Sequence, residues 1–188
     1  MLVLKDNPTG IDQPIQRLQS WLYPRLKTVW NIGDNEWMSY GRVYKNQDVK
    51  GYIPEVYVGG NEYKEVFFDD NYPVISFLGM EDKRQIDVSD NAQAYIIFQV
   101  DLSVLKPAIG HRGDEEVHMD VLNQFKTPVF GFKLSGIETG IENVFSEFRL
   151  YKRHTGQMTN TESIKYRDMH PLHCFKVTFN LKYKNNNC

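Results

Sequence analysis

Apolar residues near the start of the chain recur at helical spacing. Successive steps of four, three, four and four residues separate Ile11, Ile15, Leu18, Leu22 and Leu26. This spacing places the five side chains on one stripe and predicts an amphipathic helix. Asp12 is expected to cap its first turn, where Pro14 is tolerated because the earliest backbone donors have no partner within the helix. Pro24 is expected to end the helix or to kink it.

Beyond residue 36 the pattern becomes that of strands. Runs of β-forming residues are separated by glycines at positions 41, 51, 59 and 60, which predicts a meander of antiparallel strands. Gly59, Gly60 and Asn61 tolerate the positive φ angles of a tight hairpin, so we expect one there.

Two later segments are expected at the centre of the sheet. Residues 74–78 and residues 93–102 are dominated by bulky β-forming side chains and are bounded by acidic or turn-forming residues. The charged residues 81–85, followed by the polar residues 89–91, are expected to form an exposed loop between these strands.

A second helix is predicted at residues 114–125. Its apolar stripe consists of Val117, Val121, Leu122 and Phe125. Acidic residues occupy its first turn, where they complement the helix dipole. A further short helix is predicted around residues 140–148. The polar residues 152–163 are interpreted as an extended loop or arm.

The last segment has the clearest strand pattern in the chain. Alternate positions from 173 onward carry His173, Phe175, Val177, Phe179, Leu181 and Tyr183. This period of two predicts a strand with one buried face. The other face, which carries the alternate positions from Cys174 onward, is expected to be exposed to water. All these elements together predict a single α+β domain over residues 1–188. Its sheet is mostly antiparallel and is packed by the N-terminal helix and the middle helix.

The composition excludes several classes of protein. The 188 residues are 41% hydrophobic and 13% aromatic, too rich for intrinsic disorder. A formal charge of −2 provides no general attraction to nucleic acid. No apolar run is long enough to cross a bilayer, and the first residues lack the pattern of a signal peptide. Since no segment is long enough to span a bilayer, we expect no membrane partner. Cys174 and Cys188 make no disulfide framework, so we expect a reducing compartment.

One group of candidate metal ligands lies at the start of the second helix. Glu115 and His118 are three residues apart and share a helix face, and His111 precedes them. Two facing groups do not make a metal site. The acidic residues are better explained as a solvated helix start that complements the dipole.

A second group surrounds the start of the last strand. Asp168, His170 and His173 lie close in sequence to Cys174, which suggests a metal site or a Cys–His pair. Neighbouring strand residues point to opposite faces, so His173 and Cys174 cannot act together unless the strand is bulged. A structural role is favoured for these residues.

No common catalytic motif is present in the sequence. It lacks a phosphate-binding loop ending in Gly-Lys-Ser or Gly-Lys-Thr, a Gly-x-Gly-x-x-Gly run and a Gly-x-Ser-x-Gly elbow. We therefore expect no enzyme and no cofactor, and assign no catalytic, cofactor-binding or metal-binding residue. The basic and aromatic residues 148–154 suggest contact with nucleic acid, but a charged sheet edge is the more ordinary explanation.

Aromatic residues gather around the first helix. They are Trp21, Trp30 and Trp37, together with Tyr23, Tyr40 and Tyr44. Such a group either fills the core between helix and sheet or forms a surface for a protein or a sugar.

Four segments carry a resemblance to a known family. They are residues 11–19 (IDQPIQRLQ), 54–66 (PEVYVGGNEYKEV), 111–116 (HRGDEE) and 168–173 (DMHPLH). In sequence and order they resemble the tail-terminator and neck-ring proteins of tailed bacteriophages, of the type that infects Bacteroidetes and includes the crAss-like phages. The resemblance implies a tail-terminator-like α+β fold and a homo-oligomeric ring at the head–tail junction.

The same resemblance implies the protein's partners and location. The ring would contact other neck, portal or tail proteins, and genomic DNA would pass through its lumen without being read. The subunit would be made in the host cytoplasm and end in the virion.

Two other functions remain open on the sequence. One is a monomeric carbohydrate- or ligand-binding domain with a platform at Trp37, Tyr40 and Tyr52. The other is a metal-dependent enzyme that uses His111, Glu115 and His118, or His170 and His173.

Overall fold

The computed structural model describes residues 1–49, 51–66, 69, 71–85, 90–107, 111–126, 132–148 and 169–183. The expected arm at 152–163 lies outside them, as do Asp168 and Cys188. The helices are α1 (Asp12–Trp30), α2 (Leu102–Leu105), α3 (Asp114–Phe125) and α4 (Ile141–Val144). The strands are β1 (Trp37–Arg42), β2 (Tyr44–Asp48), β3 (Gly51–Gly59), β4 (Glu62–Glu65), β5 (Val74–Gln85), β6 (Asp90–Asp101), β7 (Lys133–Thr139) and β8 (Leu172–Tyr183).

The strands form two sheets. The larger has the order β1-β5-β6-β8-β7, and the smaller has the order β2-β3-β4. All neighbouring strands are antiparallel except β1 and β5, which are parallel. The predicted α+β fold with a mostly antiparallel sheet is therefore confirmed, and residues 74–78 and 93–102 do pair at its centre.

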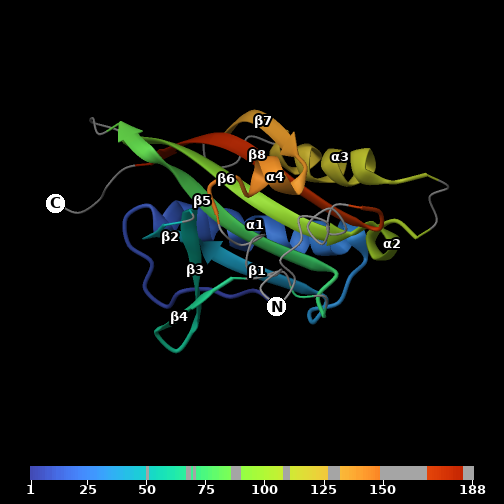
Figure 1. The fold of residues 1–188 in the computed structure, drawn as a ribbon, viewed down its shortest axis with the longest axis horizontal. Helices are drawn as coiled ribbons and strands as arrows, with labels where there is room; N and C mark the ends of the chain where they lie inside the picture. Colours follow the sequence, from blue (N-terminus) through green and yellow to red (C-terminus); the bar gives the residue numbers. More distant parts are fainter. Residues whose placement is uncertain are drawn as a thin grey trace.

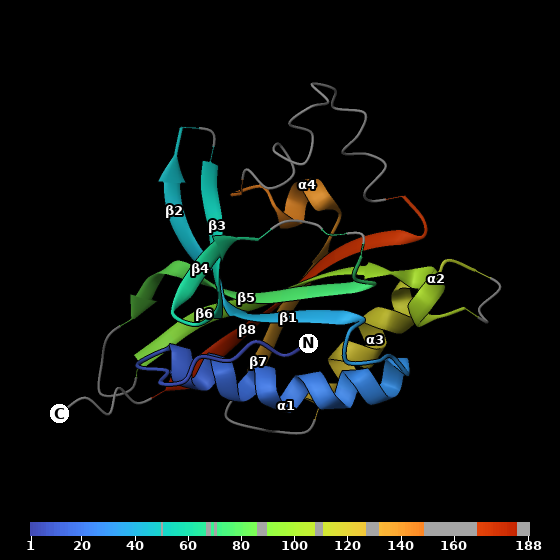
Figure 2. The same ribbon diagram turned by 90° about the horizontal axis from the view of Figure 1, so that it is seen from below.

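Two apolar cores lie on opposite faces of the larger sheet. Helices α1 and α3 pack on one face, where Ile96 and Phe98 of β6 point toward them. On the other face, Tyr95 and Ile97 of the same strand contact residues of α4 and β3. Figure 1 and Figure 2 show this order of layers, with the large sheet between α1 and α4.

The face that was expected to be wet is covered along much of β8. Cys174 is fully buried in the second core and Thr178 is 8% exposed, so the prediction of one solvated face was wrong for these positions. The alternation itself is present, because His173, Phe175, Val177 and Phe179 are buried on the α3 side. Strict alternation reports the pleat of a strand and does not show whether a second layer covers its other face.

Helix α1 continues past the proline that was expected to end or kink it. Pro24 is exposed inside the helix, which ends at Trp30 with Asn31 in the left-handed conformation. Proline costs about 3 kcal/mol inside a helix. That cost is offset because the turns beyond it bury Leu26 and Trp30, which are 0% and 3% exposed.

Residues 81–85 also differ from the prediction. They belong to β5, and Arg84 and Gln85 pair with Ala92 and Asn91 of β6. The expected charged loop is therefore largely the distal part of a long hairpin.

Glycine is required at one position in this hairpin. Gly79 pairs with Tyr95, and a Cβ atom at Gly79 would lie 2.1 Å from the tyrosine ring. The bare backbone of Gly79 thus provides the space in which the ring of Tyr95 is buried.

The predicted antiparallel meander is present in β2, β3 and β4, but it does not include β1, which pairs in parallel with β5 of the larger sheet. The predictions for the two later helices and for the hairpin agree with the structure. Helix α3 has the predicted bounds, and α4 lies within the predicted short helical segment. The hairpin between β3 and β4 has positive φ angles at Gly59, Gly60 and Asn61. None of the described helices is long and apolar enough to cross a membrane.

Candidate functional site

Two histidines from separate candidate groups meet in the structure. His118 of α3 and His173 of β8 place their Nε2 atoms 2.8 Å apart, although 55 residues separate them in the chain. They are 4% and 3% exposed. The ring of Phe175 lies beside both imidazoles, with centroid distances of 4.8 and 5.7 Å. We call these two residues the histidine pair.

The charged neighbours determine the tautomers of the histidine pair. The guanidinium of Arg112 lies 3.3 Å from Nδ1 of His173 and can only donate, so this nitrogen accepts. In a neutral imidazole the other nitrogen then carries the proton, and Nε2 of His173 donates to Nε2 of His118. Nδ1 of His118 consequently carries a proton and faces the Glu115 carboxylate, 3.6 Å away.

Both histidines are held in the neutral form. Burial lowers the pKa of His118, and the carboxylates of Glu115 and Asp114 only partly oppose this. Burial also lowers the pKa of His173 to about 4, with further contributions from positive charge on His118 and Arg112. The pair therefore carries no net charge near neutral pH.

The other predicted ligands do not join this pair. His111 is exposed and lies 3.2 Å from Glu116, and its Nδ1 accepts a hydrogen bond from the Gly113 backbone. His170 is exposed. Cys174 lies in the core on the other side of the sheet, as the alternation of β8 predicts. In the described part of the chain, no three His, Cys, Asp or Glu residues are placed to hold one metal ion.

A second buried polar group, centred on Asp12, was not predicted from the sequence. Asp12 was expected to cap α1, but its side chain makes no capping hydrogen bond. Instead it accepts from Lys5 at 2.8 Å and from the Tyr44 hydroxyl at 2.9 Å, and it pairs with Arg42 at 2.9 Å. We call these four residues the Asp12 cluster. The sequence contains one sign of this cluster, an acidic residue next to the apolar stripe of the helix. A helix cap explained an acidic residue at that position equally well.

The Asp12 cluster ties the N-terminal segment to three elements. Lys5 precedes α1, Arg42 ends β1 and Tyr44 begins β2. Burial by itself would lower the pKa of Lys5, but hydrogen bonds to Asp12, Tyr44 and Tyr63 outweigh burial and raise it. Lys5 also lies over the rings of Tyr44 and Tyr63, 4.7 and 5.3 Å from their centroids. Both cations of the cluster share the one Asp12 carboxylate, so we assign the cluster a structural role.

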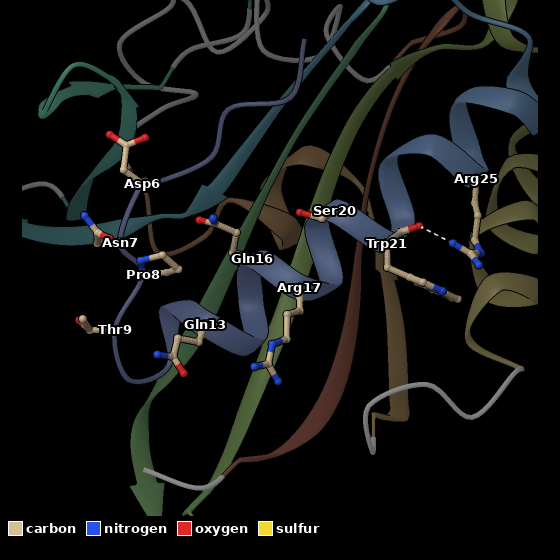
Figure 3. Close-up of a pocket in the computed structure, with 10 residues that line it drawn as sticks. All are labelled: Asp6, Asn7, Pro8, Thr9, Gln13, Gln16, Arg17, Ser20, Trp21 and Arg25. Carbon is tan, nitrogen blue, oxygen red and sulfur yellow. Dashed lines mark hydrogen bonds between the residues drawn. The ribbon is translucent and has the colours of Figure 1, made fainter. Parts of the chain in front are cut away.

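A surface hollow of about 900 Å³ lies between the N-terminal segment and the exposed side of α1. Figure 3 shows Gln13, Arg17 and Trp21 projecting from the helix opposite Asp6 to Thr9. Arg25 covers the Trp21 ring, with its guanidinium 4.5 Å from the ring centroid. Most of the residues that line the hollow are polar, and Arg25 already covers the ring of Trp21, the one aromatic residue among them.

The aromatic residues singled out from the sequence have mainly core positions. Trp30 and Trp37 are 3% and 1% exposed and pack against Phe98. Tyr40 and Tyr52 are half-buried against the second core. Trp37 therefore does not provide the surface platform for a sugar that the sequence allowed. Phe148 is also buried, and the rest of that basic and aromatic segment, residues 149–154, lies outside the described ranges.

The smaller sheet stands out from the body of the molecule. Figure 2 shows the hairpin of β2 and β3 extending away from the large sheet. Val49, in the turn after β2, is 99% exposed. At its base the smaller sheet is anchored by Val56, which is 1% exposed and packs in the second core. We call strands β2, β3 and β4 the projecting sheet.

No family model, curated protein or solved structure matches the chain.

Proposed function

We propose that the chain is a structural subunit of a tailed-phage neck that assembles with its own copies into a ring at the head–tail junction. In this role the ring connects the portal or adaptor to the tail and surrounds the path of the DNA. Its partners are further copies and other neck, portal or tail proteins. The subunit is made in the host cytoplasm and becomes part of the virion.

The projecting sheet is the observation that carries this proposal. A ring subunit needs two unlike surfaces, because each copy contacts one neighbour with the first and the other neighbour with the second. The projecting sheet is firmly anchored at Val56 while Val49 at its tip is 99% exposed, which suits an element that reaches a neighbouring copy.

Its exposed side chains also suit a protein contact. Tyr63 of β4 is 42% exposed, and its ring packs edge-on against Tyr44 and Tyr57. A tyrosine that is held rigidly by other rings loses little conformational freedom on binding. Residues 54–66, which carry much of the phage resemblance, include most of β3 and all of β4.

The proposal is tested by the native mass and shape of the purified protein. We expect native mass spectrometry to find a closed multimer larger than a dimer, and negative-stain electron microscopy to show rings with a central opening. A protein that remains a monomer or dimer at every concentration contradicts the proposal.

A matched pair of variants tests the contribution of the projecting sheet. Val49→Asp places a charge at the exposed tip, so it should abolish the multimer without affecting the folded subunit. Val29→Asp places the same charge on α1, where Val29 is 45% exposed and lies away from the projecting sheet. It should leave the multimer intact, and equal effects of both variants would contradict a specific contact at the tip.

A further inference from the structure

Strand β7 is an edge of the larger sheet and is accessible to a partner. One side of β7 pairs with β8, and no strand in the described ranges pairs with its other side. Every residue of β7 except Leu134 is exposed. The opposite edge differs, since Leu2 forms a bridge to Ser39 of β1. An exposed edge strand presents unpaired backbone donors and acceptors to a further strand.

A β-bulge in β7 determines which of its side chains lie on the same face of the sheet. The register with β8 shifts between Leu134 and Gly136, which takes Ser135 out of the alternation. Leu134 and Ile137 therefore oppose Phe179 and Val177, on the face that carries α1 and α3.

The two charged residues of β7 lie together on the other face. Lys133 and Glu138 oppose Asn180 and Lys176 of β8. Glu138 pairs with Lys176 at 3.0 Å, and its side chain is 48% exposed. The strand thus carries one apolar pair on one face and one pair of opposite charges on the other.

We propose that two copies of the chain pair through β7, as antiparallel strands about a two-fold axis, to form one continuous sheet. In the register that places Leu134 opposite Ile137 of the second copy, Lys133 lies opposite Glu138 of that copy. Both contacts occur twice because of the symmetry. The strand is therefore complementary to itself in charge and in apolar character.

Other registers lack this complementarity. A shift of two residues in either direction separates both the charged pair and the apolar pair, and a shift of one residue exchanges the faces. Parallel in-register pairing would place each Lys133 beside its own copy, where like charges repel. The sequence of β7 thus selects one partner strand, a second β7, and one register.

This dimer goes beyond the proposed neck ring and stands without it. A two-fold contact closes on itself, whereas a ring contact joins unlike surfaces. The contact involves one short strand from each copy, so it belongs to the small interfaces that form and dissociate readily. We therefore expect the contact to join two copies, whether free or part of a ring, to an extent that depends on protein concentration.

Sedimentation velocity over a range of concentrations tests the proposal with two charge variants. Lys133→Glu alone and Glu138→Lys alone each place like charges opposite each other, and each should weaken the dimer by about tenfold or more in Kd. An equimolar mixture of the two variants should restore the dimer, because every charged contact in the mixed pair again joins opposite charges. Arg17→Glu, at an exposed position of α1 outside β7 and the projecting sheet, is the control for the change in net charge.

The mixture distinguishes edge pairing from a loss of folding. Circular dichroism of each variant should match the parent protein, and a misfolded variant would not be rescued by its partner. A parent protein in which neither free subunits nor rings associate two by two at any concentration overturns the proposal. So does a dimer that neither variant weakens, or a mixture that dimerises no better than the separate variants.

Discussion

The Asp12 cluster and the histidine pair are both buried polar groups, but the protein stabilises them in opposite ways. Asp12 is surrounded by Lys5, Arg42 and the Tyr44 hydroxyl, so its negative charge is offset by opposite charge and hydrogen bonds. The histidine pair has a positive neighbour in Arg112, and burial keeps both imidazoles neutral. A buried ion needs a partner of opposite sign, whereas a buried imidazole can release its proton.

The largest expected effect comes from removing the centre of the charged group. Asp12→Ala leaves Lys5 and Arg42 close together without their shared carboxylate, which should cost about 3 kcal/mol in the free energy of unfolding. Urea unfolding measures this loss. Gln13→Ala, at the next and exposed helical position, is the matched control. A loss below about 1 kcal/mol would show that the cluster is more solvated than its burial indicates.

Breaking the neutral pair should have a smaller effect. His118→Ala removes the acceptor for Nε2 of His173 and should cost about 2 kcal/mol, because a buried donor is left unpaired. Replacing both His118 and His173 by Leu should be less damaging than His118→Ala, since no buried imidazole donor remains and Arg112, which is 41% exposed, still pairs with Asp114. The same unfolding experiment measures both variants, with His111→Ala as an exposed control. A double variant that is less stable than the single one would contradict this account.

The pH dependence of stability tests whether the histidine pair is neutral in the folded protein. The unfolded chain binds a proton at His173 near the ordinary pKa of 6.5, while the folded chain binds it only at a pKa of about 4. The free energy of unfolding should therefore be highest above about pH 6.5 and fall as the pH drops toward 4. The loss from His173 should be about 1 kcal/mol between about pH 6 and about pH 5. The doubly substituted leucine variant should lose less stability over this interval, and parallel curves would contradict the assignment.

The smallest effect is expected for an ion pair at the surface. Asp34 bonds to Lys27, but its side chain is 77% exposed. Asp34→Ala should leave the unfolding midpoint almost unchanged, because water and salt screen exposed charges. Thermal unfolding at low and high salt measures the difference. A loss comparable to that of Asp12→Ala would mean that burial does not distinguish the two carboxylates.

The sequence predicted best those features that depend on neighbouring residues. The bounds of α3 follow from its apolar stripe and the acidic residues in its first turn. The hairpin after β3 follows from Gly59, Gly60 and Asn61, since few other residues accept positive φ angles. Local spacing also predicted correctly that His173 and Cys174 would face opposite sides of the sheet.

The features that the sequence analysis missed depend on segments far apart in the chain. Pro24 is a strong local signal for a helix end, but the burial of Leu26 and Trp30 against the sheet outweighs it. His118 and His173 meet only because α3 packs beside β8, and spacing within either segment cannot show this. The same holds for Asp12, whose partners Lys5, Arg42 and Tyr44 come from three other segments.

The parallel pairing of β1 with β5 has a consequence for the order of folding. Trp37 pairs with Val74, 37 positions later, whereas Gln85 and Asn91 of the β5–β6 hairpin are six positions apart. Closing the longer loop costs more chain entropy, so β1 is expected to join the sheet after the hairpin has formed. Pulsed hydrogen exchange should then protect amides of β5 and β6 before those of β1. During that interval Val74 to Leu78 form an open apolar edge, which makes this stage the one most exposed to aggregation.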